Sequence, residues 1–142
     1  MKGPIIKIVF ILFALFCLSF AAPSAQAAYT EYVYTVYDLA GDPVGELSFN
    51  YAIGASVPSS WSFYGFVEGV DYGGDTFTGA DGILCYSPPF RFFAKPDPNF
   101  VGPMPNLLIT DPFGPPMVTP WGTFPLPGWV CKASFKEVIS HP

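Results

Sequence analysis

The chain has 142 residues, of which 51% are hydrophobic, 18% aromatic and 12% charged, and it carries a formal net charge of −5. Such a chain repels phosphate backbones and anionic membrane surfaces, so its composition disfavours nucleic acid as a partner. A single domain is expected at this length.

The first 27 residues have the three parts of a secretory signal peptide. A basic start precedes the apolar run of residues 8–22, and residues 25–27 (Ala-Gln-Ala) supply the small-x-small pattern of a cleavage site. The apolar run is shorter than the about 20 residues that a spanning helix needs, so cleavage is favoured over a membrane anchor. We therefore expect residues 28–142 to form the mature, secreted or periplasmic protein, without a membrane span.

Removal of this segment changes both the charge and the cysteine count. Four basic residues then remain against eleven acidic residues, which gives a net charge of −7. Cys17 is lost, so Cys85 and Cys131 are the cysteines that remain. Two cysteines in an oxidising compartment most simply pair with each other, and two buried free thiols are the alternative. We therefore expect a Cys85–Cys131 disulfide.

Short runs of β-branched and aromatic residues, separated by turn residues, predict an all-β domain. Residues 29–39 form the first run, a turn rich in Gly, Asp and Pro follows, and residues 46–53 alternate apolar and polar side chains. Further strands are expected at residues 61–70, 83–87 and 129–139. Regular turn signals and the lack of a helical pattern favour a small antiparallel β-sandwich, with a β-barrel as the alternative.

The segment between the cysteines, residues 86–130, holds twelve of the seventeen prolines together with eight Phe or Trp residues. Proline has no N–H for a sheet ladder, so only short edge strands at residues 90–93 and 106–110 are expected here. The aromatic content argues against disorder, and the lack of a basic residue in 107–130 argues against a ligand for proline-recognition domains. We expect an ordered loop that the disulfide closes and whose aromatic side chains pack on the sheet.

Few residues in the sequence offer catalytic chemistry. The one histidine, His141, is next to the last residue, and the sequence lacks the motifs of zinc sites, phosphate-binding loops and nucleophile elbows. Two carboxylates drawn from Glu46, Glu68 or Asp71 would suit a glycoside hydrolase, but nothing in their spacing selects a pair. We therefore expect no catalytic residues and a protein that is not an enzyme.

An acidic, glycine-rich stretch is the candidate metal site. Carboxylate oxygens close together suit calcium, although Asp and Gly are also the residues of ordinary turns, which is the preferred interpretation. The four candidate ligands are Glu68, Asp71, Asp75 and Asp81. No other cofactor is expected.

Aromatic residues are the candidate ligand platform. A flat aromatic face stacks sugar rings in many exported β-sandwich modules. The candidates are Trp61, Tyr64, Tyr72, Trp121 and Trp129. The preferred interpretation is that the tryptophans belong to the core and anchor the proline-rich loop, and the platform is the alternative.

Two stretches resemble small exported bacterial proteins of the PEP-CTERM (exosortase-sorted) type. Residues 28–49, AYTEYVYTVYDLAGDPVGELSF, are similar to the start of their mature chains, and residues 128–135, GWVCKASF, to their closing strand. The resemblance implies a β-rich, matrix-associated protein. The chain ends in VISHP, without the Pro-Glu-Pro motif, hydrophobic span and basic tail of that type, so the resemblance carries over neither cell-surface sorting nor functional residues.

Taken together, the sequence predicts an exported, noncatalytic β-domain with a structural or protein-interaction role. A carbohydrate-binding module is the alternative, and a carboxylate-based hydrolase is the weakest of the three. The expected partner is a protein or a glycan that the sequence does not identify, and the oligomeric state is not predicted.

Overall fold

The computed structural model describes residues 27–110, 117–124 and 130–142, and these contain ten β-strands joined by turns and loops. The strands are β1 (Tyr29–Tyr37), β2 (Pro43–Ala52), β3 (Ser60–Gly65), β4 (Asp71–Thr78), β5 (Ile83–Ser87), β6 (Phe90–Pro96), β7 (Leu107–Thr110), β8 (Met117–Thr119), β9 (Gly122–Phe124) and β10 (Cys131–His141). The all-β prediction is confirmed. No helix long and apolar enough to cross a membrane occurs within these ranges.

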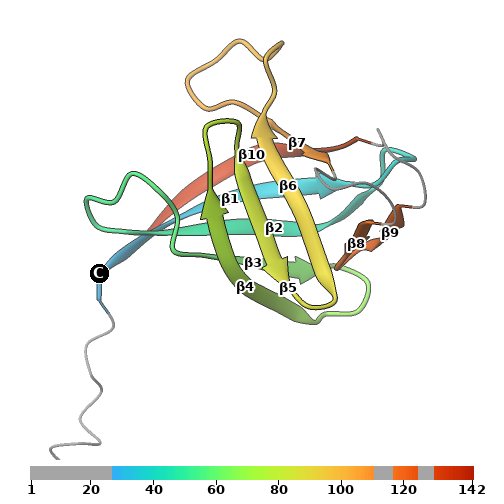
Figure 1. Cartoon of the computed structure of the whole chain (residues 1–142), viewed down its shortest axis with the longest axis horizontal. Coiled ribbons are helices and arrows are strands. Elements are labelled where there is room, and N and C mark those ends of the chain that lie inside the picture. Colours follow the sequence, from blue (N-terminus) through green and yellow to red (C-terminus); the bar gives the residue numbers. More distant parts are fainter. Residues whose placement is uncertain (1–26, 111–116, 125–129) are drawn as a thin grey trace, which may run out of the picture.

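Eight of these strands close into an antiparallel barrel (Figure 1). Each strand from β1 to β6 pairs with the next one in sequence, and β10 pairs with both β7 and β1 and thereby closes the ring. β8 and β9 form a separate two-stranded hairpin. Of the two architectures that the sequence allows, the chain therefore forms the barrel rather than the sandwich, and closure leaves no unpaired edge in the wall.

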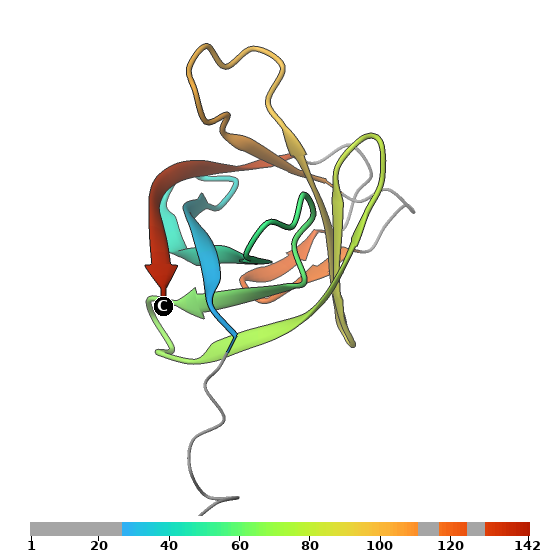
Figure 2. The ribbon, with the colours of Figure 1, turned by 90° about the vertical axis from the view of Figure 1, so that its left-hand side faces the viewer.

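The antiparallel order places alternate connections at opposite ends of the barrel. The end that carries the β8–β9 hairpin, called the hairpin end below, has the connections 38–42, 66–70 and 88–89 (Figure 1). The opposite end, called the loop end, has the connections 53–59, 79–82 and 97–106. Figure 2 looks onto the loop end, where the start of β1 and the end of β10 lie side by side.

Aromatic side chains fill the interior near the hairpin end. Trp61 and Phe63 on β3 and Phe92 on β6 point inward and are buried, and the rings of Trp61 and Phe92 meet edge to face with centroids 5.1 Å apart. Trp121, from the turn between β8 and β9, packs on both Phe63 and Phe92 at centroid distances of 5.1 Å. The hairpin therefore closes this end of the barrel with a large side chain.

The proline-rich segment contributes more to the wall than the sequence predicted. β6 and β7 lie within residues 86–130 and each pairs with a strand on both sides, so the edge strands expected at 90–93 and 106–110 are in fact interior strands of the barrel. The prolines avoid the centres of these strands, because Pro88 and Pro89 form the turn before β6 and Pro96 ends it. Residues 111–116 and 125–129 of this segment lie outside the described residues.

The expected Cys85–Cys131 disulfide is wrong. Both thiols are free and buried in the barrel interior, Cys85 on β5 and Cys131 on β10. β6 and β7 lie between these two strands in the wall. Neighbouring strands are about 4.8 Å apart, so three such spacings exceed the Cα separation of about 7 Å that a disulfide tolerates. The residues between the cysteines build the strands that keep them apart.

We expect the folded protein to resist thiol modification. Burial raises the pKa of Cys131 to about 12 and that of Cys85 well above its usual value, so neither is a reactive thiolate at neutral pH. A protein of residues 28–142, purified without reductant, should take up no iodoacetamide when it is folded. In guanidinium chloride it should take up two iodoacetamide labels, one on each cysteine, as measured by intact mass spectrometry. Labelling of the unfolded chain only after reduction would contradict the free-thiol state.

A glycine in β2 makes room for the aromatic interior. Gly45 lies opposite Gly65 on β3, and a Cβ at this position would lie 2.3 Å from both the ring of Phe63 and the carbonyl oxygen of Tyr64. Real Cβ atoms do not approach other atoms so closely, and the carbonyl belongs to a paired strand. The tight packing of Phe63 therefore requires glycine here.

The substitution Gly45→Ala should lower the free energy of unfolding by about 1–3 kcal/mol, the usual cost of an overpacked core. Urea denaturation followed by tryptophan fluorescence measures this change. Gly79→Ala is the matched control, because an added Cβ there has no atom within 4 Å, and it should change the free energy by less than about 0.5 kcal/mol. Equal losses in the two variants would refute the packing argument.

Candidate functional site

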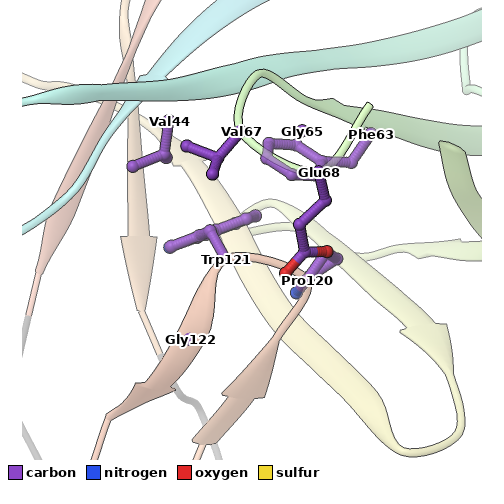
Figure 3. A pocket seen from close by; sticks show the side chains of 8 residues that line it. All are labelled: Val44, Phe63, Gly65, Val67, Glu68, Pro120, Trp121 and Gly122. Atoms are coloured by element: carbon purple, nitrogen blue, oxygen red, sulfur yellow. The ribbon is translucent and has the colours of Figure 1, made fainter. Parts of the chain in front are cut away.

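A pocket of about 340 Å³ opens at the hairpin end, between the 66–70 connection and the turn of the β8–β9 hairpin (Figure 3). Val44, Val67, Pro120 and Trp121 give it a mostly apolar lining, and Glu68 is the charged residue of that lining. In Figure 3 the side chains of Val44 and Val67 lie on one side of the Trp121 indole, and the Glu68 carboxylate reaches toward Pro120. Apolar walls with one polar group are typical of binding pockets.

Trp121 forms the floor of this pocket, and the hairpin turn holds it in place. The Thr119 hydroxyl donates a 2.7 Å hydrogen bond to the Gly122 carbonyl, and Gly122 adopts a φ of +149° that favours glycine. The indole Nε1 is buried and makes no hydrogen bond with the described residues. It approaches the Cys131 thiol closely enough to offset a small part of the burial effect on that thiol's pKa, but sulfur is too weak an acceptor to replace a hydrogen bond.

A β-bulge places Val44 in the pocket wall. The register between β1 and β2 shifts so that Val36 pairs with Gly45 and Tyr37 with Pro43. Val44 is the extra residue of this bulge, and a bulge redirects the side chain that it carries. Val44 is consequently half-buried against the core instead of lying in an ordinary turn.

Glu68 is fixed by its neighbours in the 66–70 connection. The Gly65 N–H donates to the Val70 carbonyl at 3.1 Å and the Gly69 N–H to the Gly65 carbonyl at 2.9 Å, which folds the connection back on itself. The Glu68 carboxylate accepts a 3.0 Å hydrogen bond from the Tyr72 hydroxyl. This hydrogen bond raises the pKa of Tyr72, because the neutral phenol donates to the carboxylate and a phenolate would face a second negative charge.

The Glu68–Tyr72 hydrogen bond gives a pH-dependent prediction. Tyr72 should keep its proton above pH 10, and Glu68→Gln should lower its pKa toward the usual value, because the negative acceptor is removed. The ¹³Cζ chemical shift of Tyr72, followed by NMR from pH 8 to 12, measures both values. Asp71→Asn neutralises a neighbouring carboxylate that does not bond Tyr72 and should leave its pKa unchanged. An unaltered pKa in Glu68→Gln would rule out the hydrogen bond.

The predicted aromatic platform is not assembled by the described residues. Trp61 is 1% exposed, and its Nε1 donates to the Tyr86 carbonyl at 3.4 Å. Tyr72 points inward and meets Phe90 edge to face, with centroids 5.0 Å apart. Tyr64 is 43% exposed, but it points away from the barrel interior. Trp121 alone among the predicted platform residues lines the pocket of Figure 3, and Trp129 lies outside the described residues.

The predicted calcium ligands are spread along β4, so the structure contradicts that site. Glu68 and Asp71 lie at the hairpin end, Asp75 lies within β4, and Asp81 lies in the connection at the loop end. The eight residues of β4 rise about 26 Å, whereas calcium ligands all lie within about 2.6 Å of the ion. Across the described ranges, no group of three or more His, Cys, Asp or Glu residues is arranged to hold a metal.

The remaining candidates for acid–base chemistry also lie apart. Glu46 projects from the outer face of β2 and is bound to Lys136 of β10, across the intervening β1. The His141 ring stacks on Tyr29 with centroids 4.2 Å apart and contacts the Glu31 carboxylate at 3.1 Å, at the loop end. Neither group reaches the pocket at the hairpin end. Its described lining therefore offers apolar contact and one carboxylate, which are means of binding.

No family model matches this chain, and no curated protein or solved structure matches it either. The function must therefore be argued from the pocket itself. Sequence reasoning had named Glu68 and Trp121 for separate reasons but did not bring them together. It missed Val44 and Val67, because the first reads as part of a turn and the second as part of a strand.

Proposed function

We propose that this chain is an exported, noncatalytic domain that binds a protein partner through its hairpin end. The observation that carries the proposal is the exposed apolar rim of the Trp121 pocket. Val67, at the tip of the 66–70 connection, is 94% exposed, and Phe66 and Val70 beside it are also exposed. Contiguous apolar side chains rimmed by polar groups are typical of protein interaction sites.

The pocket supplies an anchor point for such a partner. Trp121 is held by aromatic contacts to Phe63 and Phe92, so it presents a rigid surface and loses little side-chain entropy on binding. Tryptophan is enriched among the residues that dominate binding energy. Covering Val67 completely would contribute about 1.5–3 kcal/mol of hydrophobic free energy. An apolar side chain of the partner that enters between Val67 and Trp121 would gain hydrophobic contact with both residues.

The charge at this end favours a basic partner. Asp38, Asp42, Glu68 and Asp71 lie in the hairpin-end connections or at the first residue of β4. Lys132, which lines a pocket with Asp38, and Arg91, which lines one with Pro88 and Pro89, also lie at this end, so its charge is acidic but not uniformly so. A Lys or Arg side chain next to the apolar anchor would complement Glu68 and orient the partner.

Export and the absence of catalysis are part of the same proposal. The signal-like residues 1–27 support export, although residues 1–26 lie outside the described residues. The aromatic side chains that fill the interior near the hairpin end, and the single carboxylate in the described pocket lining, which is held by Tyr72, support binding rather than bond cleavage. The weak resemblance to exported matrix-associated proteins agrees with this proposal and adds no site residues.

A glycan is the second candidate ligand, and Trp121 beside Glu68 is the observation that favours it. An indole face stacks on the apolar face of a sugar ring, and a carboxylate accepts hydrogen bonds from its hydroxyls. The single tryptophan in the described pocket lining makes this the weaker candidate, because the exposed Val67 has no role in it.

A peptide array and a glycan array, both probed with residues 28–142, separate the two candidates. We expect binding to peptides in which an apolar residue is flanked by Lys or Arg, and none to the same peptides with Glu in place of the basic residue. Val67→Asp should weaken this binding at least tenfold and Glu68→Gln severalfold. Val57→Asp, the same change at an exposed valine of the loop end, is the matched control and should have no effect.

Two results would overturn the proposal. One is glycan binding that Glu68→Gln abolishes and Val67→Asp spares, which would establish the second candidate instead. The other is peptide binding that Val57→Asp and Val67→Asp reduce equally, which would place the binding surface elsewhere.

A further inference from the structure

A second cavity, of about 310 Å³, lies at the loop end of the barrel and is separate from the pocket of Figure 3. Its inner wall consists of core residues, among them Tyr34, Phe49, Ala94 and Leu107. Met104 and Pro105 of the 97–106 connection line it from outside the barrel wall. Eight-stranded barrels are either filled by side chains or hold one small ligand, and the mouth of a barrel is a common place for such a ligand.

The size of the inward side chains explains why the cavity is at this end. On β6, the inward-facing residue changes from Phe92 to the smaller Ala94 toward the loop end. On β4, the inward-facing residue at the loop end is Thr78. Near the hairpin end, Trp61, Phe63 and Trp121 fill the interior, whereas the small residues near the loop end leave space unfilled. The loop end of the interior is therefore apolar and open to the 97–106 connection.

Tyr34 gives this cavity a hydrogen-bonding group. It is 6% exposed and packs edge to face on Phe49 and Phe135, with centroids 6.1 Å and 5.6 Å away. Among the described residues, Trp121 Nε1 is the one buried side-chain nitrogen or oxygen without a partner, so the Tyr34 hydroxyl is not an orphaned group, and Tyr34 contributes to the lining of the cavity. Burial, and to a smaller extent the neighbouring Tyr51 and Tyr32, raise the pKa of Tyr34 to about 12, so at neutral pH the hydroxyl is a donor.

We infer that this cavity binds a small neutral molecule, an apolar ring or short chain with one carbonyl or ether oxygen that accepts a hydrogen bond from Tyr34. The volume is about twice that of the roughly 150 Å³ cavity that holds benzene in an engineered core. An anion is disfavoured, because it would lose its hydration among apolar side chains and would face Asp81 in the lining. The site is independent of the protein-binding role proposed for the hairpin end.

Three probes of similar shape test this inference: acetophenone, ethylbenzene and benzoate. Titration of ¹⁵N-labelled residues 28–142 should move the amide signals of Ile83, Ala94 and Leu107 and leave that of Val67 at the hairpin end in place. Ethylbenzene, which has no acceptor, should bind about five- to tenfold more weakly than acetophenone, because the hydrogen bond to Tyr34 is lost. Benzoate should not bind measurably.

Variants identify the donor. Tyr34→Phe should reduce the affinity for acetophenone to that for ethylbenzene and leave the affinity for ethylbenzene unchanged. Tyr64→Phe removes the same oxygen atom from an outward-facing tyrosine and should change neither. Ala94→Val, with folding verified by its amide spectrum, narrows the cavity and should weaken both ligands.

The inference fails if millimolar acetophenone moves none of the loop-end amides. It also fails if acetophenone and ethylbenzene bind the unsubstituted protein equally, a comparison that needs no variant to fold. Tight binding of benzoate would exclude the neutral ligand class, and binding unaffected by Tyr34→Phe would exclude Tyr34 as the donor.

Discussion

The pairing of β10 with both β1 and β7 is the constraint on which the rest of the structure depends. β10 thereby connects β1, the first strand of the meander, to β7, its last strand, and closes the sheet into a barrel. Once the wall is closed, each inward side chain competes for a fixed volume, so packing at one end determines what remains at the other. Closure also explains the bulge in β10 near Lys136, because a long strand that bends around a small barrel must accommodate strong twist.

The fixed volume is filled unequally, and this inequality produces two different ends. At the hairpin end, Trp61, Phe63 and Phe92 fill the interior and Trp121 packs over them, so the pocket at this end lies on the outside. At the loop end, Ala94 and its small neighbours leave space inside the wall, where a ligand would be enclosed. The two proposals therefore concern different settings in one fold: a pocket on the outside at one end and an apolar cavity inside the wall at the other.

The sequence predicted the strands better than their arrangement. Alternation in residues 46–53 identified β2 correctly, because a half-buried strand has a period of two wherever it lies. Barrel and sandwich could not be separated, since closure depends on pairs such as Tyr29 with His141, which no local pattern reports. The pocket was equally hidden: Val44 reaches it through a bulge, and Glu68 and Trp121 meet only because the hairpin folds over the barrel end. Proline was taken to limit this region to short edge strands, but Pro88, Pro89 and Pro96 lie before β6 and at its end and leave its centre free to pair on both sides.

The free thiols, which were the alternative to the expected disulfide, remain compatible with the proposed export. A thiol is oxidised through its thiolate and only where an oxidant or a second thiol can reach it. Burial keeps both Cys85 and Cys131 protonated, and β6 and β7 hold them apart across the wall. Covalent closure is also unnecessary here, because the backbone hydrogen bonds of β10 already close the chain on itself. In this fold the two cysteines are interior packing residues, and their presence carries no information about the compartment.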